Sequence, residues 1–240
     1  MSLEGNPTVM DVDDLRIFSL FRRRRLSTTE TDGNPLIYAL KEMNGYAIKD
    51  ACKENMWRAA SEVFQAWECP WKPSCVVSIP SRHAVSSDLA SQIASYLKVD
   101  HISVPMVHKK TVKEVLKEAE ELKNKGAVPV RDLNAFKKQL GKLSSAPAGK
   151  TFQMKEIDVR VRRYLHPWRV SEEAKAFIGQ DFLLVDDLIG SGASLATCAR
   201  CLKSEGHSIV GGMSLFSPLD RELTQRALKA RGKRQRRKKT

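Results

Sequence analysis

The sequence lacks both a long apolar run and a leader-like N-terminus. None of its apolar stretches approaches the roughly 18 residues that a membrane-spanning helix requires. Its first residues, MSLEGNPTVMDVDD, are acidic and polar, whereas a secretory signal is basic and then apolar. Hydrophobic residues make up 42% of the chain and charged residues 29%, as in ordinary globular proteins. We therefore expect a cytoplasmic protein without a membrane partner, with one substantial core in its 240 residues.

Cysteine is scarce, and its five copies form no disulfide framework. Their odd number favours a reducing compartment. The C-x-x-C pair Cys198 and Cys201, together with Cys69 and Cys75, leaves a zinc site open as an alternative. Because Cys198 and Cys201 fall on one face of a predicted helix, where small apolar residues pack, we favour core cysteines.

Two common nucleotide-binding motifs are also absent, since neither G-x-x-x-x-G-K-[ST] nor G-x-G-x-x-G occurs. The sequence contains instead FLLVDDLIGSGASL at residues 182–195. Its apolar run, residues 182–185, is typical of a strand buried on both faces of a parallel sheet. Asp186 and Asp187 come next, where an open α/β sheet usually binds its ligand. This stretch is the strongest indication of a binding site in the chain.

A turn of small residues follows the two acids. It consists of Gly190, Ser191, Gly192, Ala193 and Ser194. Backbone N–H groups of such a turn, together with the start of the next helix, can hold a phosphate. The alternative is a buried strand with an ordinary turn and helix cap.

The apolar run, the two acids and the Gly/Ser turn resemble the phosphoribosyl-diphosphate signature of the type I phosphoribosyltransferases. The resemblance implies an α/β fold with a Rossmann-like parallel sheet flanked by helices. It also implies that Asp186 and Asp187 contact the ribose hydroxyls and that residues 190–194 wrap the 5′-phosphate. Mg²⁺ is the implied cofactor, held through its waters by the two acids. Gly190 and Ser194 stand where the family commonly has threonine, but both preserve a loop that donates hydrogen bonds.

An earlier strand-to-helix turn supplies the weaker part of the predicted site. Residues 75–79, CVVSI, form a compact β-branched run that predicts a core strand. Ser81, Arg82 and His83 follow it, where the family cradles pyrophosphate. Lys109 stands where family members often place a basic residue that faces pyrophosphate. The alternatives are an arginine in solvent at a strand end and a lysine on a solvated face.

From about residue 107 to 165 the chain leaves the predicted sheet. Residues 101–107 are expected to form a sheet strand, after which two helical patterns occur. The alternation in residues 151–165 predicts a further strand, and we interpret its arginines as charges that protect a sheet edge. A long excursion predicts a functional hood. In the family, a mobile loop inserted before the signature strand closes over the reacting centre.

Basic residues are concentrated at the C-terminus. The net charge is +13, and residues 221–240 hold ten basic residues against one acid, or +9. We predict a loosely ordered or edge-hairpin segment at 1–33, a phosphoribosyltransferase-like domain at 34–218 and a basic tail at 219–240. The tail has no apolar residues to pack near its end, so we predict that it binds nucleic acid by releasing counterions. A solubilising tail is the alternative.

Two functions fit these features. The first is a glycosyltransferase that binds phosphoribosyl diphosphate with Mg²⁺ and transfers the phosphoribosyl group to a base or amine. The alternative is a catalytically silent module of the same fold with a nucleic-acid-binding or regulatory role. LIYALKEMNG and DDLIGSGASLATCARCLKSEG look most like the phosphoribosyltransferase-like proteins associated with bacterial DNA uptake, whose N-terminal zinc ribbon has no counterpart here. The acceptor and a homodimer stay open.

Overall fold

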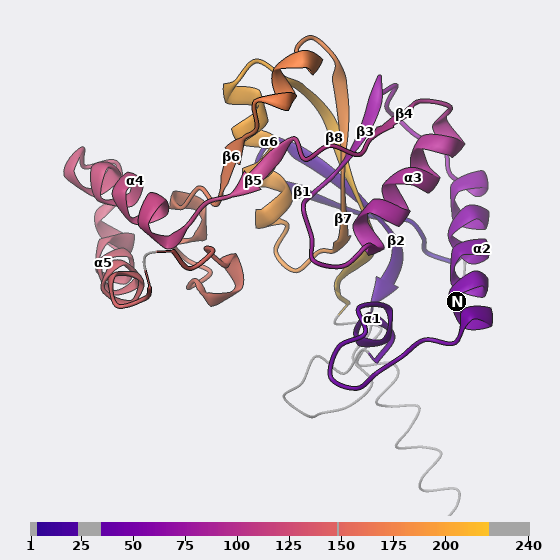
Figure 1. Ribbon diagram of the computed structural model, residues 1–240, viewed down its shortest axis with the longest axis horizontal. Helices are drawn as coiled ribbons and strands as arrows, with labels where there is room; N and C mark the ends of the chain where they lie inside the picture. The colour runs from indigo at the N-terminus through magenta and orange to yellow at the C-terminus, as the bar shows by residue number, and fades with distance from the viewer. Residues whose placement is uncertain (1–3, 24–34, 148, 221–240) are drawn as a thin grey trace, which may run out of the picture.

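The computed structural model describes residues 4–23, 35–147 and 149–220 (Figure 1). Its centre is a six-stranded sheet of order β1-β2-β8-β7-β3-β4, parallel throughout except for the antiparallel pair β1–β2. The strands are β1 Thr8–Val12, β2 Leu15–Arg23, β3 Cys75–Ser78, β4 Asp100–Ile102, β7 Asp181–Leu188 and β8 Ser208–Leu219. The predicted fold class, a mostly parallel α/β sheet flanked by helices, is confirmed.

Helices cover both faces of this sheet. One face carries α1 Pro35–Leu40, α2 Asp50–Ala66 and α3 Val85–Leu97, and the other carries α6 Ala193–Ser204 and the 3₁₀ helix η3 Glu173–Phe177. In β7, Leu183 and Val185 join the first core, whereas Phe182 and Leu184 join the second. Because β7 is buried on both sides, its sequence is apolar without alternation.

Residues 111–165 form a lobe beside the sheet, called the hood lobe below (Figure 1). It contains α4 Val112–Asn124, α5 Val130–Ser144 and the 3₁₀ helices η1 Met154–Glu156 and η2 Arg162–Tyr164. Phe136, Phe152 and Leu165 belong to a hydrophobic cluster that is separate from the two cores of the sheet. The chain enters the lobe through β5 Val107–Lys109 and leaves it through β6 Trp168–Val170, which pair with each other.

The prediction of a loosely ordered segment at 1–33 is wrong for residues 8–23. These residues form the alternative, an edge hairpin, in which β2 also pairs in parallel with β8. Leu15 and Ile17 are 2% and 0% exposed, so burial of apolar side chains orders the hairpin. Residues 24–33 lie outside the described part of the chain. The basic tail from residue 221 onward lies outside it too.

One further strand prediction holds only at its start, and another is wrong. The stretch 101–107 contributes to two short strands in different sheets, because Pro105 between them has no N–H to donate to a ladder. The stretch 151–165 forms local turns, in which the Val161 N–H donates to the Asp158 carbonyl at 3.0 Å. These turns direct its apolar residues into the core of the hood lobe, namely Phe152, Ile157, Val161 and Leu165.

Neither a membrane-spanning helix nor a metal-ligand cluster is found in the described ranges. No helix there is long and apolar enough to cross a membrane. No group of three or more histidine, cysteine or acidic residues there is arranged to hold a metal ion. Cys198 lies on the buried face of α6, in the second core of the sheet, and burial raises the pKa of its thiol well above the usual value.

Candidate functional site

The two acids of the signature strand lie side by side near the carboxyl end of β7. Asp187 is buried, and both of its carboxylate oxygens contact the Nζ of Lys41, at 2.7 Å and 2.9 Å. Lys41 comes directly after α1. Asp186 keeps some exposed surface, and its Oδ1 accepts the backbone N–H of Asp187 at 2.8 Å. A lysine thus neutralises one acid and the backbone holds the other beside it.

Asp186 has an unusual pKa for a carboxyl group. Removal from water disfavours its charged form, and the negative charge of Asp187 adds to this effect, so the pKa of Asp186 is raised to about 7. The Asp187 N–H, Lys41 and Lys109 oppose the shift. Near neutral pH, Asp186 therefore exchanges between a neutral form that donates a hydrogen bond and a charged form that accepts one. Both forms suit a sugar hydroxyl.

The Gly/Ser turn lines a cavity of about 130 Å³, called the phosphate cavity below. Residues 190–194 form one wall, and Asp186, Met154 and Arg162 also line it. Arg162 comes from the hood lobe, and its Nε–H donates to the Ile157 carbonyl at 2.9 Å. Our interpretation of Arg162 as an edge-strand charge is therefore wrong. The cavity combines a helix start with a guanidinium, two features that favour an anion.

A second cavity of about 280 Å³ adjoins the first and is called the ribose cavity below. The two share Met154, Asp186 and Ser194 as lining residues. Asp187, Lys41, Ser81 and Lys109 also line the ribose cavity. One ligand can therefore contact the acids and the Gly/Ser turn together.

Trp168 forms the hood-side wall of the ribose cavity. Its Nε1–H donates to the Ser194 carbonyl at 3.1 Å. The Nζ of Lys109 lies 5.7 Å from the centroid of the Trp168 ring, within the range of a cation–π contact. Strand β6 thereby links the Gly/Ser turn to the lysine predicted to face pyrophosphate.

A third cavity, of about 370 Å³, surrounds the turn between β3 and α3. Ser81, Arg82 and His83 line it, and it shares residues 79–81 with the ribose cavity. Ser86, in the first turn of α3, also lines it. Its Oγ is buried and has no hydrogen-bond partner among the described residues. An unpaired hydroxyl at a helix start favours an anionic group in this cavity.

The three cavities bring together every residue predicted for the site. Three further lining residues were not predicted, namely Lys41 directly after α1, Met154 of the hood lobe and Trp168 of β6. No local sequence pattern marks these residues, because each reaches the site through contacts with residues far away in the sequence. Lys41, for example, is 146 residues from the acid that it neutralises.

The N-terminal hairpin, β1 and β2, packs against the Gly/Ser turn at Gly192. Gly192 has a φ of +73°, and a Cβ there would lie 2.7 Å from Val12 Cγ2 and 2.8 Å from Met10 Cε. Arg200 of α6 also pairs with Asp13 in the hairpin, at 2.6 Å. The hairpin thus helps to fix the position of the turn.

We expect Gly192→Ala to destabilise the fold by about 1–3 kcal/mol, because the new methyl group would crowd Val12 and Met10 at a left-handed φ. Urea unfolding would measure the loss. Gly190→Ala is the matched control in the same turn, since its Cβ would meet no atom within 4 Å. Equal stability of the two variants would show that the hairpin does not constrain the turn.

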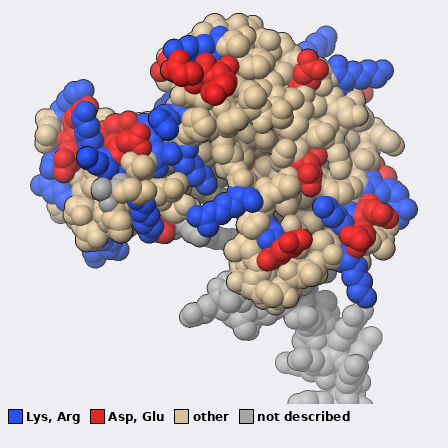
Figure 2. Space-filling view, in the orientation of Figure 1, with Lys and Arg blue, Asp and Glu red and all other residues tan. Residues whose placement is uncertain are grey.

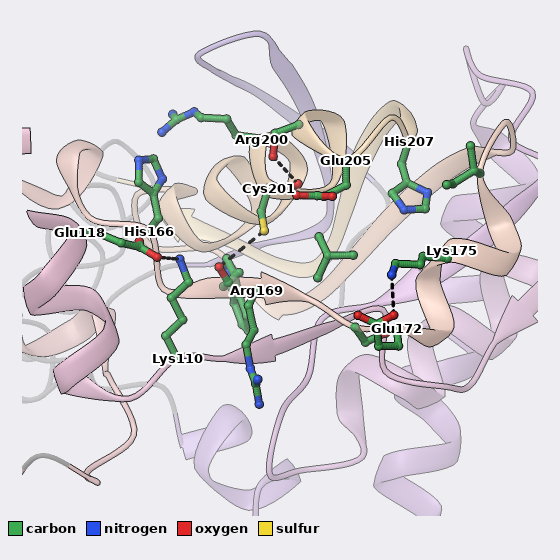
Figure 3. Close-up of a pocket in the computed structure, with 15 residues that line it drawn as sticks. Lys110, Glu118, His166, Arg169, Glu172, Lys175, Arg200, Cys201, Glu205 and His207 are labelled. Atoms are coloured by element: carbon green, nitrogen blue, oxygen red, sulfur yellow. Dashed lines mark hydrogen bonds and ion pairs between the residues drawn. The ribbon is translucent and has the colours of Figure 1, made fainter. Parts of the chain in front are cut away.

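A larger cavity of about 800 Å³ lies between the C-terminal half of α6 and the β6–η3 segment (Figure 3). It contains none of the predicted site residues. Three of its cations already face acids, in the pairs Lys110–Glu118, Lys175–Glu172 and Arg200–Asp13. Its size is therefore a weaker argument for function than the chemistry of the three smaller cavities.

The acid pair fits a hydrated Mg²⁺ better than a directly ligated one. Oxygen ligands suit this ion, which usually keeps several of its waters. Both oxygens of Asp187 already contact Lys41, whereas Oδ2 of Asp186 accepts no hydrogen bond within the described ranges. Contact through water leaves the Lys41 pair intact.

Comparisons with known proteins leave the family undetermined. No protein-family model matches the chain, and no curated protein matches it. Among solved structures, the chain is similar to an adenine phosphoribosyltransferase from Leishmania donovani, with 11% identity and a TM-score of 0.37. The likeness covers 90% of this chain and 89% of that chain. Because so low a TM-score carries no argument, the α/β fold rests on the observed sheet topology, and the family remains an expectation from the signature.

Proposed function

We propose that the joined cavities bind phosphoribosyl diphosphate with Mg²⁺ and that the protein transfers the phosphoribosyl group to a base or amine. The observation that carries the proposal is the common wall of the ribose and phosphate cavities, which Asp186 and Ser194 help to form. A ribose 5-phosphate carries hydroxyls on its ring and a phosphate on the exocyclic C5′, a short distance away. It can therefore contact the acids and the Gly/Ser turn together.

In this proposal, Asp186 and Asp187 hold the ribose hydroxyls and residues 190–194 hold the 5′-phosphate, with Arg162 as an additional cation. The diphosphate extends toward Ser81, Arg82, His83, Lys109 and the start of α3. When bound, Mg²⁺ would neutralise the diphosphate and touch the two acids through its waters. Transfer at C1′ needs no protein nucleophile. The chain must hold the sugar, stabilise departing pyrophosphate and exclude water.

A thermal-shift measurement tests the binding. Millimolar phosphoribosyl diphosphate with Mg²⁺ should raise the melting temperature, because saturation at about 100 times the dissociation constant adds roughly 2.7 kcal/mol to the stability. The double variant Asp186→Asn and Asp187→Asn should lose the shift. The single variant Asp186→Asn leaves the Lys41–Asp187 pair intact, so it should remain folded and reduce the shift. Absence of a shift in the unaltered protein would contradict the proposal.

The catalytically silent alternative is favoured by the charge of residues 221–240, a net +9. Release of pyrophosphate in the presence of candidate bases would support the enzyme. Binding without release, together with gel shifts of nucleic acid that weaken when the chain is truncated after residue 230, would support the alternative.

A further inference from the structure

The hood lobe carries much of the positive charge that lies outside the C-terminal tail. Residues 111–165 contain 13 lysines and arginines against seven acidic residues, a net charge of +6. Lysine and arginine side chains cover much of this lobe in the view of Figure 2. The lobe has its own hydrophobic core, so its outer faces do not pack on the sheet.

The two helices of the lobe differ sharply in their charge. α4 contains three lysines against four glutamates. α5 contains four cations and a single acid, Asp132. That acid is already engaged, because it accepts hydrogen bonds from the Tyr164 hydroxyl and from Arg163, both at 2.5 Å. The excess charge of the lobe's helical part therefore lies on α5.

The cations of α5 lie on its solvent side. Arg131, Lys138 and Lys142 are separated by seven and four residues, so they follow one another along one side of the helix over about 16 Å. All three are exposed, as is Lys137 beside them. None of the three lysines forms an ion pair within the described ranges, and only Arg131 approaches an acid, with its Nε 3.8 Å from Asp132. We call these four residues the α5 basic face.

We propose that the α5 basic face is a docking surface for the phosphate backbone of nucleic acid. A row of exposed cations on a rigid helix, of which the three lysines form no ion pair within the described ranges, complements the regular negative charge of such a backbone. A membrane is a poorer fit, because an interfacial helix must insert an apolar face. The apolar residues of α5 are instead buried in the lobe, namely Phe136, Leu140 and Leu143. This inference does not depend on phosphoribosyl chemistry.

The test compares two charge-matched triple variants of the full chain. The first variant replaces Lys137, Lys138 and Lys142 by glutamine and so removes three charges from the α5 basic face. The second variant replaces Lys113, Lys117 and Lys123 by glutamine and so removes three charges from α4, whose four glutamates offset its lysines. The affinity of each for a 30-base-pair DNA duplex is measured across a salt series. Glutamine keeps the helix propensity of lysine, so both variants should remain folded.

We expect the α5 variant to lower the magnitude of the negative slope of log affinity against log salt by about 2.7, since each lost phosphate contact on duplex DNA removes about 0.9 from it. The α4 variant should change the slope by less than about 1. The thermal shift with phosphoribosyl diphosphate should be the same in both variants, which separates this proposal from the proposed function.

Three results would overturn the proposal. The first is an unaltered protein that does not bind the duplex, and the second is an equal change of slope in the two variants. The third is binding to vesicles of anionic lipid, but not to DNA, that is lost in the α5 variant. That last result would assign the face to a membrane.

Discussion

Replacing Lys41 by methionine is expected to destabilise the fold by roughly 3–5 kcal/mol, because it leaves the buried carboxylate of Asp187 without its counter-ion. The side chains of Lys41 and Asp187 are 18% and 7% exposed, so water cannot replace the lost lysine well. Urea unfolding at neutral pH would measure the loss. It should be among the largest effects of any single substitution at the site.

Lys53→Met is the matched control for this experiment. Lys53 and Asp88 lie 3.9 Å apart and are 46% and 40% exposed, so their pair should contribute at most about 1 kcal/mol. The double variant Lys41→Met and Asp187→Asn should recover much of the stability, since it removes the stranded charge as well. If Lys41→Met costs no more than Lys53→Met, the Lys41–Asp187 pair does not stabilise the site.

Replacing Asp186 by asparagine is expected to change how stability depends on pH. The folded protein keeps the Asp186 proton up to about pH 7, whereas an unfolded carboxyl releases it near pH 4. Between these values the folded state binds more protons, so raising the pH lowers the stability of the unaltered protein. The asparagine side chain resembles the neutral acid and does not titrate, so the variant would not lose stability in this way as the pH rises. The variant's stability relative to the unaltered protein should therefore rise by about 2–4 kcal/mol from pH 4 to pH 7 and level off above.

The control for this pH series is Asp158→Asn. Hydrogen bonds from Arg160 lower the pKa of the half-buried Asp158 to about 2, so this acid is charged throughout pH 5–8 in both the folded and unfolded states. Its variant should show a constant stability difference over that range. If the curve for Asp186→Asn is equally flat when measured by urea unfolding, Asp186 is an ordinary charged carboxylate.

Sequence alone sufficed where the signal is local and contiguous. The apolar run at 182–185 requires a strand buried on both faces, and such strands occur in parallel sheets covered by helices. The two acids and the Gly/Ser turn follow along the chain without interruption, so their proximity needs no tertiary contact. Helices α2, α3 and α5 were predictable for the same reason, because three- and four-residue spacing of apolar side chains acts within one element.

Tertiary contacts decided the rest of the site. Residues 151–165 show strand-like alternation, yet within the described ranges their pairing is limited to an isolated antiparallel bridge between Thr151 and Thr111. Burial in the lobe core favours local turns instead. The order of the N-terminal hairpin depends on β8, which lies near the other end of the chain. Lys41, Arg162 and Trp168 enter the site through contacts with residues far away in the sequence. The local sequence thus specifies the acid pair and the Gly/Ser turn, whereas long-range packing supplies the cations and the aromatic wall that surround them.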